Sequence, residues 1–141
     1  MTCPLCARNG EQVVWEDAHC RVIQVADGEH PGLCRVIWHE HVAEMTDLLA
    51  ADRHHLFEVV LATELALRNL LHPDKINLAS LGNLVPHLHW HVIPRYSDDI
   101  HFPLSIWGPA GAGKELHPAA DPVALSRAID DALASLQHAE S

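Results

Sequence analysis

The stretch 86–93 constrains the fold of this chain most strongly, because a histidine occupies every second position in it. The three are His87, His89 and His91, and an apolar residue follows each of them. A β-strand sends alternate side chains to opposite faces, so this pattern predicts a strand with three imidazoles on one face. A helix would not produce such a face, because residues two apart do not share a side of it.

Further segments extend this strand into a sheet. Strands are predicted where β-branched and aromatic residues gather between turn residues, at 12–15, 19–25, 33–38 and 75–81. Gly82-Asn83 is expected to form a tight turn from the last of these into the histidine strand. We expect that antiparallel pair to lie at the centre of the sheet.

Two helices are expected as well. Apolar residues at three- and four-residue spacing predict one over 51–71. A second is predicted over 121–138, with Asp121 as its N-cap and Pro122 as its first residue. The strands are grouped rather than alternating with helices, which favours an α+β fold. We expect an antiparallel sheet of about five strands, with the long helix packed on it and a C-terminal helix.

Length, composition and charge narrow the class of protein. The chain has 141 residues, of which 48% are hydrophobic, enough for one domain with a real core. We expect the domain core over 1–105, with 106–141 forming a connector and a helix on the same domain. The net charge of −10 disfavours binding to DNA or RNA, which depends on basic patches. We see no membrane-length apolar run and no secretory start, and therefore expect a cytoplasmic protein outside membranes.

Three chemistries fit three histidines on one face. The middle ring can attack phosphorus as a neutral imidazole, while its neighbours orient it or bind phosphate oxygens. The rings can instead hold a catalytic metal, as in three-histidine zinc sites. They can also bind a nucleotide without turning it over.

The residues around the strand resemble the histidine triad (HIT) family, whose signature is His-φ-His-φ-His-φ-φ with φ apolar. The stretch 87–93, His-Leu-His-Trp-His-Val-Ile, contains this signature in full. Gly82-Asn83 stands where that family usually has Gly-Gln, and 35–48 is similar to its strand, loop and helix segment. The resemblance covers residues 1–100, and it is closest to bacterial members of dinucleoside-polyphosphate-hydrolase-like type.

The resemblance implies a nucleotide hydrolase or transferase acting at the α-phosphate of a dinucleoside polyphosphate, phosphoramidate or similar derivative. His89 would attack phosphorus and form a covalent nucleotidyl intermediate. His91 would donate to phosphate or leaving group, and His87 would support them. Substrate contacts are expected from three polar residues, Asn77, Asn83 and Asp27, with Asp27 on the ribose and residues 22–25 under the base. Because Leu33 and Leu84 depart from the family pattern, the alternative is a nucleotide-binding module with little turnover.

The cysteines suggest a metal. Cys3 and Cys6 form a C-x-x-C pair, which is half of a tetrahedral zinc site. In some family members two histidines complete such a site, and the resemblance points to His41 and His87. We therefore expect one structural zinc and no organic cofactor. The resemblance also implies a homodimer.

Overall fold

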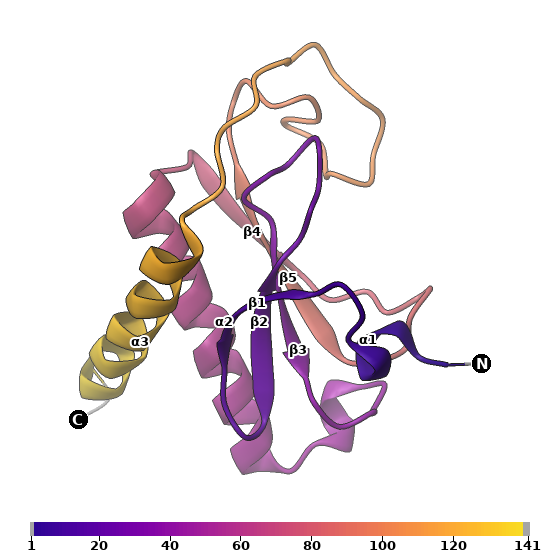
Figure 1. Cartoon of the computed structure of the whole chain (residues 1–141). Helices are drawn as coiled ribbons and strands as arrows, with labels where there is room; N and C mark the ends of the chain where they lie inside the picture. The colour runs from indigo at the N-terminus through magenta and orange to yellow at the C-terminus, as the bar shows by residue number, and fades with distance from the viewer. Residues whose placement is uncertain (1, 140–141) are drawn as a thin grey trace.

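The computed structural model describes residues 2–139. Five strands form one antiparallel sheet in the order β1-β2-β3-β5-β4 (Figure 1). The strands are β1 (Gln12–Glu16), β2 (Cys20–Gln24), β3 (Cys34–Trp38), β4 (Lys75–Ala79) and β5 (His89–Arg95). The helices are α1 (Pro4–Ala7), the 3-10 turn η1 (Met45–Asp47), α2 (Ala50–Leu71) and α3 (Pro122–Ala139). The predicted α+β fold is confirmed.

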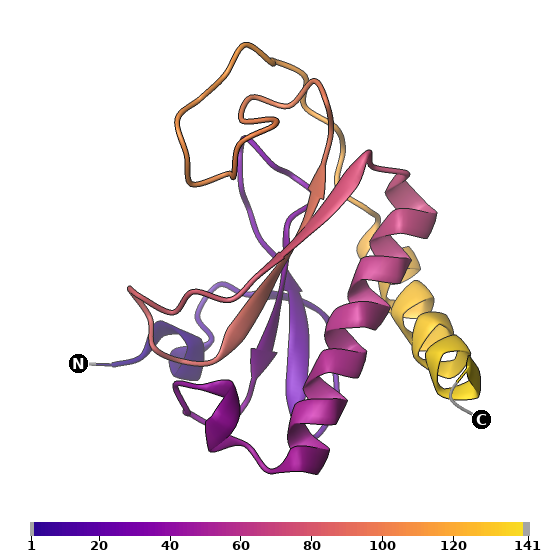
Figure 2. The same cartoon turned by 180° about the vertical axis from the view of Figure 1, so that it is seen from behind.

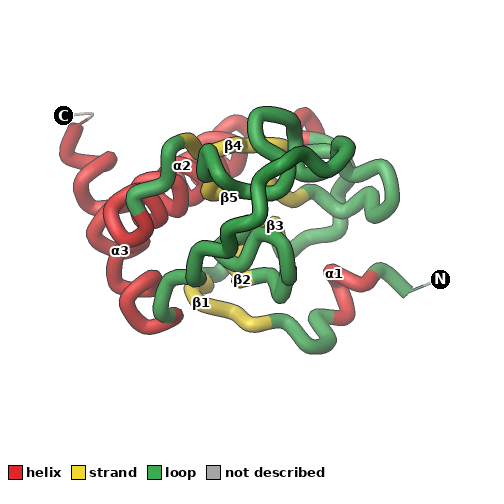
Figure 3. Tube along the Cα trace, turned by 90° about the horizontal axis from the view of Figure 1, so that it is seen from above, coloured by secondary structure: helices red, strands yellow, loops and turns green. Residues whose placement is uncertain are grey.

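The two long helices cover one face of the sheet, and α1 lies on the opposite side of the strands (Figures 2 and 3). Helix α2 packs against β3 and β5, and α3 packs against α2 and β1. Val36 of β3 and Leu67 of α2 are completely buried in this layer. The Asp121 side chain accepts a hydrogen bond from the Ala124 amide, as expected of an N-cap. No helix within residues 2–139 is both long and apolar enough to cross a membrane.

The segment ahead of the histidines differs from the prediction. A loop over 80–88, rather than a two-residue turn at Gly82-Asn83, joins β4 to β5. Strand β5 begins at His89, and the Leu88 amide donates instead to the Val42 carbonyl. Pro86 has no amide proton for a strand ladder, which is consistent with the late start. The predicted central position of the β4–β5 pair is also wrong, because β4 is an edge strand.

The face opposite the long helices carries the polar residues of interest. In the antiparallel register, Arg35 of β3 pairs with His91 of β5, and Ile37 pairs with His89. Directly paired residues project from the same face of a sheet. Leu5 of α1 packs over part of this face, in a small cluster with Ile23 of β2 and Ile37 of β3. The N-terminal segment therefore lies next to the histidines.

Two buried histidines join loops at one end of the sheet. His30 and His101 are 5% and 7% exposed, and Nε2 of His30 lies 2.8 Å from Nδ1 of His101. One nitrogen donates and the other accepts, so the contact needs one ring nitrogen without a proton. Burial lowers the pKa of His30, with Asp99 and Asp27 opposing this effect.

This pair predicts a loss of stability in mild acid. A histidine pKa lowered by folding gives stability that is present above the unfolded value of about 6.5 and lost as pH falls through the folded value. We expect the free energy of unfolding to decrease between about pH 7 and 5, and to decrease less in His30→Gln. Urea unfolding at both pH values measures this. Identical pH dependence in His30→Gln would contradict the prediction.

Candidate active site

His89 lies at the start of β5, and the backbone fixes its ring. Nδ1 lies 2.6 Å from the carbonyl oxygen of His87. A carbonyl can only accept, so Nδ1 carries the proton and Nε2 keeps its lone pair. Burial lowers the pKa of His89, the bond to the His87 carbonyl opposes this, and the Arg35 charge adds to it. The ring is therefore neutral at pH 7, and Nε2 carries a lone pair that is able to attack an electrophile.

His91 lies beside His89, with ring centroids 5.0 Å apart and planes inclined by 74°. The Trp107 ring also packs against His91, with centroids 5.0 Å apart. Burial lowers the pKa of His91 to about 4, and the nearby His89 and Arg35 contribute. Within residues 2–139, Nδ1 of His91 is buried and has no hydrogen-bond partner. Because buried polar atoms normally have one, this nitrogen marks a place where a ligand could supply it.

Both rings line a pocket of about 710 Å³, which is within the range typical of small-molecule sites. Its polar lining includes Arg35, Asn83 and Ser105 besides the two histidines. The apolar lining comes from the N-terminal segment, the 80–88 loop and the loop after β5, namely Pro4, Leu5, Leu81, Leu84, Val85 and Trp107. Apolar walls beside imidazoles and a guanidinium suit a ligand with a flat apolar part and an anionic part.

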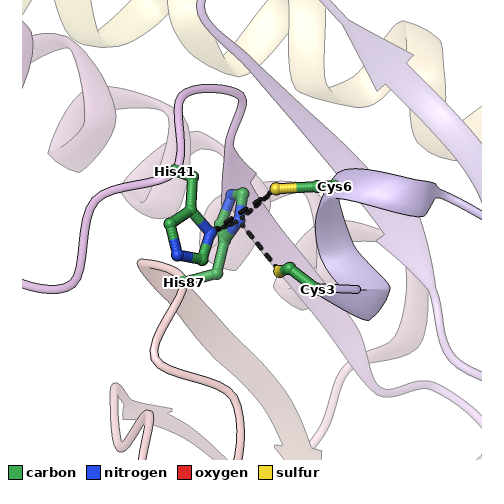
Figure 4. A group of neighbouring side chains, drawn as sticks. All are labelled: Cys3, Cys6, His41 and His87. Carbon is green, nitrogen blue, oxygen red and sulfur yellow. Dashed lines mark hydrogen bonds between the residues drawn. The ribbon is translucent and has the colours of Figure 1, made fainter. Parts of the chain in front are cut away.

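The His87 side chain lies outside this pocket and faces the cysteine pair. Its Nε2 lies 2.6 Å from the Trp38 carbonyl oxygen, so Nε2 carries the proton and Nδ1 keeps its lone pair. Nδ1 lies 3.4 Å from the sulfur atoms of both Cys3 and Cys6. It also lies 3.2 Å from Nδ1 of His41 (Figure 4). Four potential metal ligands thus converge from the N-terminus, the loop after β3 and the segment before β5.

These separations fit a tetrahedral zinc. With Zn–N of about 2.0–2.1 Å and Zn–S of about 2.3 Å, tetrahedral edges are about 3.3 Å between nitrogens and about 3.6 Å between nitrogen and sulfur. The observed His41–His87 distance is 3.2 Å, and the sulfur to nitrogen distances are 3.4 to 3.5 Å. Within residues 2–139, the other such donor group is Asp17, Cys20 and His55. The three triad rings do not converge on one point in this way.

A family model of the HIT domain matches residues 7–98. This stretch is more than half of the chain, and it contains all five strands and the three histidines. The chain belongs to the HIT domain family. The resemblance drawn from the sequence is confirmed at the level of the family, and the particular bacterial branch stays a prediction.

Solved HIT structures share the fold over nearly the whole chain. A histidine triad protein from Bradyrhizobium japonicum is 25% identical, with a TM-score of 0.67 and 92% of each chain covered. One from Marinobacter aquaeolei is 24% identical, with a TM-score of 0.69 and 93% of each chain covered. A zinc-bound histidine triad family protein from Mycobacterium smegmatis is 25% identical, with a TM-score of 0.65 and coverage of 99% of this chain and 98% of that one. Comparison with curated proteins finds no match.

The three predicted substrate contacts lie in different places in this HIT domain. Asn83 lines the pocket. Asn77 lies on β4, where its side-chain oxygen accepts a hydrogen bond from Arg95. Asp27 accepts backbone hydrogen bonds from Glu29 and His30. Neither Asn77 nor Asp27 is among the pocket-lining residues, so both roles stay predictions.

Sequence inspection missed several residues of the pocket. Arg35, Ser105 and Trp107 line it, whereas residues 22–25, expected under the base, do not. Val22 instead lies completely buried in the helix-side core. A correct strand register would have revealed Arg35, because it pairs directly with His91. No local pattern marks Ser105 or Trp107, whose loop has no periodicity.

Proposed function

We propose that this HIT protein is a nucleotidyl hydrolase or transferase acting at the α-phosphate of a dinucleoside polyphosphate, phosphoramidate or similar derivative. The observation that carries this proposal is the neutral ring of His89. Its Nδ1 proton is held by a backbone carbonyl, and its side chain lines a pocket that also contains His91 and Arg35. A fixed tautomer with a free lone pair is what nucleophilic attack on phosphorus requires.

The reaction would proceed in two displacements. Nε2 of His89 attacks the α-phosphorus, an N–P bond forms, and the bond to the leaving group breaks with its electron pair on the leaving atom. A phosphate leaves as an anion, whereas an amine leaves with a proton taken up from solvent. His91 donates a hydrogen bond to that group or to a phosphate oxygen. Nδ1 keeps its proton against the His87 carbonyl and balances the charge of the intermediate. Water then attacks phosphorus, the N–P bond returns its pair to Nε2, and the proton of the water passes to solvent.

A structural zinc held by Cys3, Cys6, His41 and His87 is part of this proposal. When bound, the metal supplies a cross-link rather than an electrophile. The zinc-bound relative from Mycobacterium smegmatis supports its presence. The His87 carbonyl accepts the hydrogen bond from His89. Fixing the His87 ring on the metal would therefore also fix the position of the nucleophile.

The alternative is a nucleotide-binding module with little turnover. Leu84 is 96% exposed at the pocket, and an apolar side chain there offers no hydrogen bond to a phosphate. Assays with diadenosine tetraphosphate and adenosine 5′-phosphoramidate separate the two functions. Release of AMP from either one supports the hydrolase. Thermal stabilisation by AMP without any product would favour the binding module.

We also propose the homodimer that the sequence suggests. Leu61 and Phe57 of α2 are 37% and 42% exposed, which leaves part of this helix available to a second copy. Leu65 of the same helix packs partly against the core. Sedimentation at micromolar concentration should give twice the chain mass, and a monomer would contradict this proposal.

A further inference from the structure

Three arginines project from the same face of the sheet, and two of them are neutralised. Arg21 is 1% exposed and donates to both carboxylate oxygens of Glu11, at 2.7 and 2.8 Å. Arg95 is 2% exposed and donates to both carboxylate oxygens of Asp99, at 2.9 and 3.0 Å. Such paired, charge-assisted hydrogen bonds are the usual way to bury a guanidinium.

Arg35 is the exception among these three. It is half-buried between β2 and β5, yet its Nε is buried without a hydrogen-bond partner. Within residues 2–139, no carboxylate forms an ion pair with it. Burial lowers the pKa of Arg35. The negative charges of Asp27 and Glu11 raise it, but neither carboxylate forms an ion pair with the guanidinium. A cation that is partly desolvated and unpaired in a pocket is arranged to receive an anion.

The register of the sheet says where that anion would lie. Arg35 pairs with His91 on the adjacent strand, whereas His89 pairs with Ile37. Positions two apart on a strand are separated by about 7 Å. Arg35 is therefore level with His91, and it lies two positions along the strand from the residue that pairs with the nucleophile His89. Both Arg35 and His91 line the pocket.

We infer that Arg35 binds an anionic leaving group, so that the substrate is a nucleotide whose α-phosphate is joined to a further phosphate. This inference rests on the proposed function, in which His89 attacks and His91 faces the leaving group. When the bond from phosphorus to the bridging oxygen breaks, its electron pair stays on the departing phosphate, and Arg35 neutralises the added charge. An uncharged amine leaving group would leave the guanidinium unpaired.

The test compares two adenylyl substrates that differ in the leaving group. Diadenosine tetraphosphate releases an anionic nucleotide, and adenosine 5′-phosphoramidate releases ammonia. We expect Arg35→Met to lower the ratio of their kcat/KM values about 100-fold, and Arg35→Lys to recover about tenfold of that loss. Arg127→Met, which removes an exposed charge on α3, should keep the wild-type ratio. A ratio within about threefold of wild type in Arg35→Met would overturn the inference.

Equilibrium binding separates this inference from the proposed function. The His89→Asn variant should bind ligands without turning them over. When Arg35→Met is added to it, the affinity for ADP should fall at least about tenfold more than the affinity for AMP. Equal weakening of both would place Arg35 on the α-phosphate and overturn the assignment to the leaving group. If wild type turns over neither substrate but Arg35→Met still weakens ADP more than AMP, the hydrolase proposal fails while the phosphate site stands.

Discussion

Replacing His89 with asparagine should abolish turnover, by at least about 10⁴-fold in kcat, while nucleotide binding survives. Asparagine keeps a polar side chain of similar size but has no ring lone pair to attack phosphorus. Because His89 is the group that would become covalently attached, its loss affects the transition state far more than the ground state. Steady-state kinetics and calorimetric titration with AMP measure the two effects separately.

The intermediate itself provides a second readout. Wild type quenched in alkali, where phosphorus–nitrogen bonds of histidine persist, should carry one nucleotidyl group on the peptide that contains His89. The variant should carry none. His101→Asn is the matched control, because that ring is buried against His30 and does not line the pocket. Activity within about tenfold of wild type in His89→Asn would exclude the covalent mechanism.

Loss of zinc should produce the largest change in stability. We expect protein purified without added metal to hold about one zinc per chain, and Cys6→Ser to bind none. Metal bound at about 1,000 times its dissociation constant stabilises a fold by about 4 kcal/mol. For a chain of this length that loss lowers Tm by roughly 10 °C. Metal analysis and thermal unfolding measure both quantities.

Chelation provides the control for this prediction. A chelator should lower Tm of wild type toward that of Cys6→Ser, and it should leave Tm of Cys6→Ser unchanged. His39→Ala, which alters a partly exposed histidine two residues before His41, should retain the metal. Wild type that holds no zinc and is as stable as Cys6→Ser would exclude the site.

Much of the fold follows from local patterns in the sequence. The alternation over 87–93 predicts β5, and the apolar spacing over 51–71 predicts α2, because each period reflects one regular backbone geometry. The errors occur where the backbone is irregular. Gly82-Asn83 resembles a turn signal, but Pro86 and the Val42 carbonyl, which pairs with the Leu88 amide, extend this connection into a loop.

The sequence by itself determined the fold class, the triad and the C-x-x-C pair, because these are written in neighbouring residues. Only the tertiary structure shows that the three histidines of the triad have different surroundings. His87 contacts the cysteines, His89 and His91 line the pocket, and Arg35 lies beside His91. These placements depend on strand register and on loops that cross the sheet, which are set by packing of the whole core. The same packing decides which arginines pair with a carboxylate and which one is available to a ligand.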